Sequence, residues 1–144
     1  MATKQDKVPP AYWFFGALLR PMLMVLTKRD WRGLEHIPRE GGFVISPNHC
    51  TYADPLAFAH FVYDSGRPPR FLAKEALFRV PIIGRLLRAA DQIPVYRNST
   101  LATSAFREAV RAVEEGKCVG IFPEGTLTRD PDLWPMRGKT GAAR

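Results

Sequence analysis

Short apolar runs alternate with longer stretches of mixed polarity along most of the chain. Four runs have the length and apolar content of buried strands: residues 42–45, 70–73, 92–96 and 117–122. The stretches between them predict helices over residues 56–63, over 75–87, and from a cap among 98–100 to 115. This alternation predicts an α/β fold with a mostly parallel sheet flanked by helices.

Prolines and glycines refine these elements. Pro81 and Gly84 predict breaks in the helix over residues 75–87, and Pro94 predicts that its strand lies at an edge or end of the sheet. Residues 31–38 predict a short strand and turn that enter the domain.

Apolar side chains in the helix over residues 75–87 have two possible uses. They either line a hydrophobic groove or belong to the core, and the pattern leaves both open. The residues concerned are Phe78, Val80, Ile82 and Ile83.

Residues 11–27 form a further apolar stretch, which predicts an N-terminal helix. Arg20 and Pro21 interrupt it, and it is shorter than the roughly 20 apolar residues of a spanning helix. Four consecutive aromatic residues at 12–15 would surround such a helix, so one buried face could not cover them all. A helix lying in the membrane interface is therefore favoured over a core helix kinked at Pro21.

Composition and charge limit the kinds of partner that the chain is expected to bind. With 144 residues, 46% apolar and 24% charged, the chain is expected to form one globular domain. Its formal net charge of +7 favours anionic partners, with basic residues enriched in the first 32 positions. No zinc-finger spacing or RNA-binding signature supports nucleic acid. Two cysteines make no disulfide framework, which indicates a reducing compartment.

Residues 47–55 connect the first strand to the next helix and carry the densest chemistry. His49 and Asp54 are five positions apart, so within one helix they would point in different directions. They can meet only if His49 lies in the turn and Asp54 in the first helical turn. Asp54 would then orient one ring nitrogen and leave the other as a general base. The alternative is that Asp54 only caps the helix.

Cofactor chemistry finds little support in the sequence. A metal site made of His49, Cys50, Asp54 and His60 lacks any recognised ligand spacing. No glycine-rich nucleotide motif is present, so no metal or cofactor is expected.

Polar residues also follow the other strands. Lys74 follows the second strand, Arg97 the third, and Glu124, Gly125 and Thr126 the fourth. Parallel strands would bring these residues to the same sheet edge as His49. Two cations beside a histidine favour a phosphate-bearing substrate, although any one of them could be a solvated surface residue.

Three sequence blocks resemble those of the membrane-associated glycerolipid acyltransferases, the family that includes lysophosphatidic acid acyltransferase. The first is N-H-x4-D at Asn48, His49 and Asp54. The second is Ile93–Arg97, and the third is F-P-E-G-T at Phe122–Thr126. The blocks occur in the family's order, and the resemblance spans residue 31 to the end. It implies an N-terminal interfacial helix over residues 1–30 and an acyltransferase domain over 31–144.

The resemblance implies transfer of a fatty acyl group from acyl-CoA or acyl carrier protein to a hydroxyl of a lysophospholipid or glycerol phosphate. His49 would take the hydroxyl proton and Asp54 would orient His49. Lys74, Arg97 and the Glu124–Thr126 segment would hold the phosphorylated acceptor, with Lys74 assigned from its position alone. A peripheral enzyme at the cytoplasmic face of an anionic membrane is expected.

The family also has a fourth block, an apolar strand with a proline, which this sequence lacks. The domain is therefore expected to be incomplete at its C-terminus, with an exposed sheet edge, and the 144-residue chain to be marginally stable and weakly active. Two alternatives remain: a thioesterase in which His49 activates water, and a non-catalytic module that binds anionic lipid.

Overall fold

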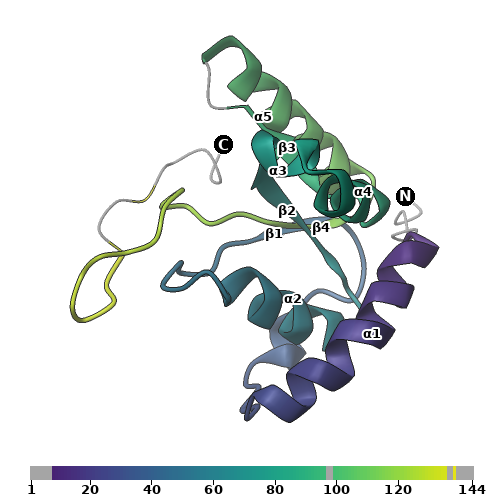
Figure 1. Cartoon of the computed structure of the whole chain (residues 1–144), viewed down its shortest axis with the longest axis vertical. Coiled ribbons are helices and arrows are strands. Elements are labelled where there is room, and N and C mark those ends of the chain that lie inside the picture. The colour runs from purple at the N-terminus through teal and green to yellow at the C-terminus, as the bar shows by residue number, and fades with distance from the viewer. Residues whose placement is uncertain (1–7, 97–98, 136–137, 139–144) are drawn as a thin grey trace.

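The computed structural model describes residues 8–96, 99–135 and 138, and a parallel four-stranded sheet lies at its centre (Figure 1). The strands are β1 (Phe43–Ile45), β2 (Pro69–Lys74), β3 (Ile93–Val95) and β4 (Cys118–Gly120). They lie in the order β1-β4-β2-β3, and every pairing is parallel. The predicted α/β class is confirmed, and so is the edge position of the strand that contains Pro94.

Helices cover both faces of this sheet. They are α1 (Pro10–Leu26), α2 (Asp54–Asp64), α3 (Glu75–Arg79), α4 (Pro81–Ala89) and α5 (Ser99–Glu114), with a short 3₁₀ turn at Leu34–His36. Successive residues of a strand point to opposite faces. On β4, Cys118 packs with Val62 of α2, whereas Val119 packs with Ala109 and Ala112 of α5. The core is therefore two layers, one on each side of the sheet (Figure 1).

Two local predictions were wrong. Residues 31–38 contain the 3₁₀ turn instead of a strand, because Gly33 adopts a left-handed conformation with φ of 83° that turns the chain. The predicted break at Pro81 occurs, with Val80 separating α3 from α4. Gly84 breaks nothing, because it lies inside α4 and its missing Cβ lets this helix approach the carbonyl of Phe78.

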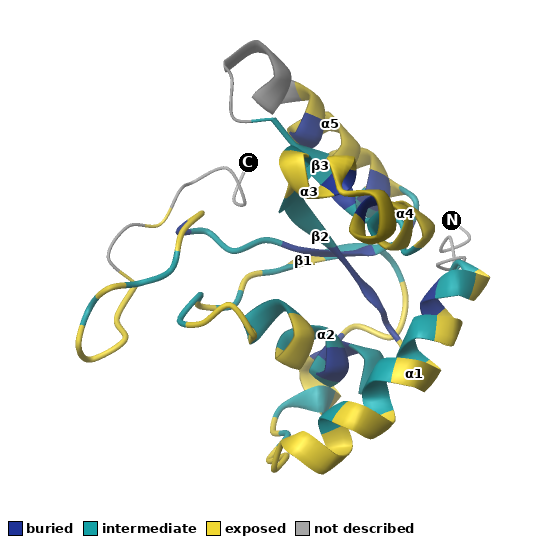
Figure 2. Ribbon diagram, viewed as in Figure 1, coloured by how far each residue is buried: buried dark blue, intermediate teal, exposed yellow. Residues whose placement is uncertain are grey.

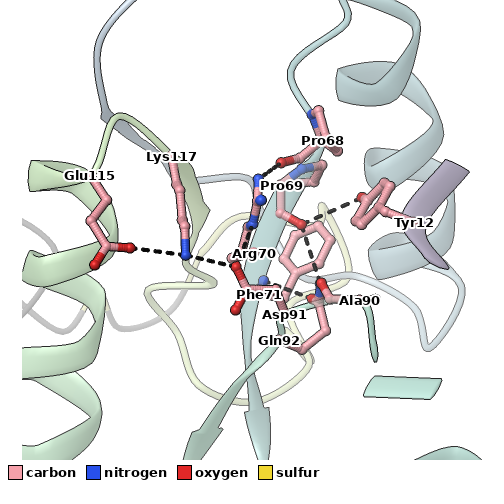
Figure 3. A network of polar contacts seen from close by, with 10 residues as sticks. All are labelled: Tyr12, Pro68, Pro69, Arg70, Phe71, Ala90, Asp91, Gln92, Glu115 and Lys117. Carbon is pink, nitrogen blue, oxygen red and sulfur yellow. Dashed lines mark hydrogen bonds and ion pairs between the residues drawn. The ribbon is translucent and has the colours of Figure 1, made fainter. Parts of the chain in front are cut away.

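The amino ends of the strands carry a charged cluster, the amino-edge network, which consists of Arg70, Asp91, Gln92, Glu115 and Lys117 (Figure 3). The Lys117 ammonium lies 2.8 Å from Asp91 and 3.1 Å from Glu115. The fully buried Arg70 lies 3.3 Å from Asp91 and also donates to the Pro68 carbonyl. These contacts join the starts of β2, β3 and β4.

Helix α1 packs against α2 on one side only. Its inward face holds the buried Tyr12, and Gly16 lies so close to Tyr63 that an added Cβ would be 2.6 Å from that ring. An ion pair of 2.9 Å joins Arg20 to Asp64 at the end of α2. The outward face is apolar and exposed (Figure 2). None of the helices within residues 8–96 and 99–135 is long and apolar enough to cross a bilayer.

Candidate functional site

His49 and Asp54 meet at the carboxyl edge of the sheet, as their spacing predicts. His49 lies in the turn after β1, and Asp54 is the first residue of α2. Their Nδ1 and Oδ2 atoms are 3.2 Å apart, and both side chains are largely shielded from solvent. Pro55 supports this geometry, since proline suits the first turn of a helix.

The carboxylate of Asp54 binds the turn that precedes its helix. Its Oδ2 accepts the backbone N–H groups of Cys50 and Thr51, and its Oδ1 accepts the Thr51 hydroxyl at 2.6 Å. Helix α2 has no side-chain cap. Asp54 therefore holds the His49 turn in shape, which is a different task from the helix cap considered as the alternative.

These hydrogen bonds also set the charge of Asp54. Partial burial acts to raise its pKa, but donation from the Thr51 hydroxyl and N–H, from His49 and from the Cys50 N–H outweighs burial and lowers the pKa below its usual value. Asp54 is therefore a carboxylate at neutral pH, and can hold a hydrogen on the Nδ1 atom of His49.

The segment after β4 forms the other half of the site. The Phe122 ring lies tilted against the His49 ring with centroids 4.3 Å apart, and Phe122 stacks on Phe71 of β2. Glu124 is buried, 6% exposed, and its Oε1 accepts the backbone N–H of His49 at 3.3 Å. The carbonyl of His49 accepts the N–H of Thr128 at 2.7 Å. The segment 122–128, about 75 residues from His49 in the sequence, thus binds both the N–H and the carbonyl of His49 and contacts its ring.

Of the remaining predicted residues, the structure describes Gly125, Thr126 and Lys74. Gly125 follows Glu124 with a left-handed φ of 64°, and Thr126 is exposed beside it. Lys74 ends β2 with an exposed side chain, and among the described residues no ion pair joins it to Asp54 or Glu124. Arg97 lies outside the described residues.

Two supporting residues were missed as site residues. Thr51 stands three positions before Asp54, a spacing typical of hydroxyl–carboxylate pairing at the start of a helix, and this signal was available. Phe122 lies within a quoted sequence block, but its contact with His49 depends on β1 and β4 being neighbours.

The arrangement is competent for general base catalysis. Asp54 engages Nδ1 of His49, which leaves Nε2 as the nitrogen that can accept a proton. Phe122 lies against the ring, and two hydrogen bonds hold the His49 backbone, so little motion is needed before reaction.

Known proteins are similar to this chain over most of its length. The acyltransferase family model matches residues 13–144. A 1-acyl-sn-glycerol-3-phosphate acyltransferase of Borreliella burgdorferi is 37% identical over 101 residues, which cover 69% of this chain and 39% of that protein. An enzyme of the same name from Bacillus subtilis is 30% identical over 110 residues, or 76% of this chain and 53% of the relative.

The fold has a solved counterpart. The crystal structure of the 1-acyl-sn-glycerophosphate acyltransferase of Thermotoga maritima superposes with a TM-score of 0.57 at 22% identity, covering 83% of this chain and 60% of that one. The chain thus spans about 40–60% of the length of the relatives named here. From the match over residues 13–144, the chain belongs to the acyltransferase family.

Proposed function

We propose that this protein transfers a fatty acyl group from a thioester donor, acyl-CoA or acyl carrier protein, to a hydroxyl of a lysophospholipid. Lysophosphatidic acid is the first acceptor to test, because the relatives at 37% and 30% identity are named for it. The observation that carries the proposal is the 3.2 Å contact between His49 and Asp54 in a chain of this family.

In the proposed reaction, Nε2 of His49 removes the proton of the acceptor hydroxyl as its oxygen attacks the thioester carbonyl. Asp54 stabilises the positive ring that forms. The carbon–sulfur bond then breaks, and the ring returns the proton to the departing thiolate. The products are an ester and a free thiol, with no covalent acyl-enzyme. The contact of Phe122 with the His49 ring supports this role, since it limits the rotation of the ring.

The acceptor phosphate is proposed to lie beside this pair, near Lys74, Arg97 and Thr126. The left-handed turn at Gly125 supports this position because the absence of a Cβ allows close approach to the backbone. Glu124 is proposed to keep the phosphate pocket in register with His49 through its bond to the His49 N–H. The reaction needs no metal or cofactor besides the donor.

The acceptor is a lipid, so the protein is proposed to work as a peripheral protein at the cytoplasmic face of an anionic membrane. The exposed apolar face of α1 supports this, since Val25 is 86% and Leu18 63% exposed. The basic residues near the N-terminus would add attraction to anionic lipid.

The test is thiol release from palmitoyl-CoA by the native-length protein, with and without lysophosphatidic acid. Release that needs the acceptor is expected, and His49→Ala should lower it by roughly 10³-fold, within the range for loss of a general base. His36→Ala is the matched control, because His36 is highly exposed and distant in sequence from the site.

Two outcomes would contradict the proposal. Acceptor-independent release of free fatty acid would indicate a thioesterase instead. Lipid binding without thiol release from any donor, unchanged in His49→Ala, would indicate a non-catalytic membrane module.

A further inference from the structure

Helix α4 presents its apolar side to the outside of the molecule. Ile82 is 73% exposed, and Ile83 and Leu86 are also exposed. At 100° per residue these three side chains share one side of the helix. Of the four residues for which a groove and a core are both possible, only Phe78 is buried, so Val80, Ile82 and Ile83 do not belong to the core.

The opposite side of α4 faces the protein. Gly84 is buried against the carbonyl of Phe78, and the guanidinium of Arg88 donates to the same carbonyl at 2.8 Å. Both contacts fix the rotation of the helix about its axis. A surface helix usually has the reverse arrangement, with its apolar stripe toward the core. The outward apolar side is thus held in place by specific contacts.

Basic residues outnumber acidic residues in this part of the chain. Residues 74–90 contain one acid, Glu75, which is paired to Arg79 at 2.6 Å. Arg85 is exposed on α4 itself. The next acid, Asp91, is bound by Lys117. Exposed isoleucine and leucine beside the exposed Arg85 match the chemistry of an anionic bilayer surface, where apolar side chains enter the acyl boundary and cations meet the headgroups.

Helix α4 also lies next to α1. The two helices contact each other, and both carry exposed apolar residues on their outward sides (Figure 2). Helix α4 follows directly on α3, which begins where β2 ends beside the candidate site (Figure 1). A membrane contact at α4 is therefore connected through α3 to the carboxyl edge of the sheet.

We infer that α4, through Ile82, Ile83 and Leu86 with Arg85, is a second contact with the anionic membrane, separate from α1. The inference deepens the proposed function, because it rests on a membrane-borne acceptor. It concerns how the domain is oriented on the bilayer. If α1 were the only contact, the domain could rotate about that helix. Two contacts would hold the carboxyl edge of the sheet at a defined angle to the bilayer.

The test is co-sedimentation of the chain with phosphatidylcholine vesicles, with and without phosphatidylglycerol. The double variant Ile82→Ser/Leu86→Ser should weaken binding to the mixed vesicles about tenfold, because two apolar side chains that would be partly buried in the bilayer are lost. The matched control is Phe106→Ser/Val110→Ser on α5, where the side chains are 40% and 39% exposed. The control should bind like the wild type.

A charge variant separates the electrostatic contribution to vesicle binding from the apolar one. Arg85→Glu should weaken binding to vesicles that contain phosphatidylglycerol and leave binding to pure phosphatidylcholine unchanged. Circular dichroism and thermal unfolding should match the wild type for all variants, because every changed side chain is exposed.

Three results would overturn the inference. Unchanged binding of Ile82→Ser/Leu86→Ser, beside loss of binding in Leu18→Ser/Val25→Ser, would make α1 the sole contact. A wild-type dimer that the α4 variant dissociates without lipid would assign the surface to a second copy. Equal weakening in the α5 control would make the effect non-specific. Failure of acyl transfer would leave these binding measurements unaffected, so the two proposals fail separately.

Discussion

The two ends of the sheet are both polar, but their polar groups are used differently. At the amino edge, the charges neutralise one another. The cavity of about 250 Å³ beside the amino-edge network is lined by three basic and three acidic residues: Arg70, Arg111, Lys117, Asp91, Glu108 and Glu115. Asp91 bridges two cations, and Gln92 binds the backbone of β2 and Ala90 (Figure 3).

At the carboxyl edge, the acids bind neutral groups and a histidine. Asp54 accepts from two backbone N–H groups and a hydroxyl, and Glu124 accepts from the N–H of His49. Lys74, a cation that the structure describes at this edge, is exposed. One end of the sheet thus satisfies its charges internally, which stabilises the fold. The other leaves a histidine and a cation available to a ligand.

The largest effect is expected when one carboxylate at each edge is replaced by an amide. Asp54→Asn should lower kcat for acyl transfer by roughly 10²–10³-fold, because the amide cannot stabilise a charged His49 ring. Asp91→Asn, the same change at the amino edge, should leave kcat within about twofold. Steady-state thiol release measures both. A larger kcat loss in Asp91→Asn than in Asp54→Asn would reverse the assignment of the two edges.

A stability measurement should show that the amino-edge network stabilises the fold. Arg70→Met removes a fully buried guanidinium and its bonds to Asp91 and Pro68, so the free energy of unfolding should fall by about 2 kcal/mol. Arg85→Met, on the exposed side of α4, should change it by less than about 0.5 kcal/mol. Urea unfolding with a constant m-value provides both numbers. Equal effects would mean that the amino-edge network contributes nothing specific.

The smallest predicted effect is a difference in how the stability contributed by Lys117 and by Asp54 depends on pH. For Lys117, burial acts to lower the pKa, but bonds to Asp91 and Glu115 raise it above its usual value. Its stabilisation is therefore complete below the unfolded pKa, about 10.4, and is lost as pH rises through the higher folded value. Lys117→Met should cost about 1 kcal/mol at neutral pH, and this deficit should shrink above about pH 10.

For Asp54 the pH dependence of stability has the opposite sign. Its lowered pKa means that stabilisation is complete above the unfolded value, about 3.9, and is lost as pH falls through the lower folded value. The stability deficit of Asp54→Asn should therefore shrink on the acid side only. Unfolding midpoints of the wild type and both variants across pH measure this. A deficit that shrinks on the same side for both variants would contradict the comparison.

The chemistry of the carboxyl edge could be predicted where it depended on nearby residues. His49 and Asp54 are five positions apart within one connection, so backbone geometry alone limits how they meet. Glu124 is 75 residues from His49, and its bond to the His49 N–H required β4 to lie beside β1. No pattern in the apolar runs distinguishes which strand becomes the neighbour of which. The contact of Phe122 with His49 was missed for the same reason.

The sequence by itself determined the alternation of strands and helices, the turn at His49 and the edge position of the strand with Pro94, since apolar period, proline chemistry and short spacing act over a few residues. Tertiary structure decided the order β1-β4-β2-β3, the self-neutralising network at the amino edge and the outward direction of the α4 apolar side. These three features depend on which surfaces, far apart in the sequence, pack against each other and exclude water. Gly84 illustrates the point, because its lack of a side chain was predicted to break a helix and instead lets that helix pack against the backbone.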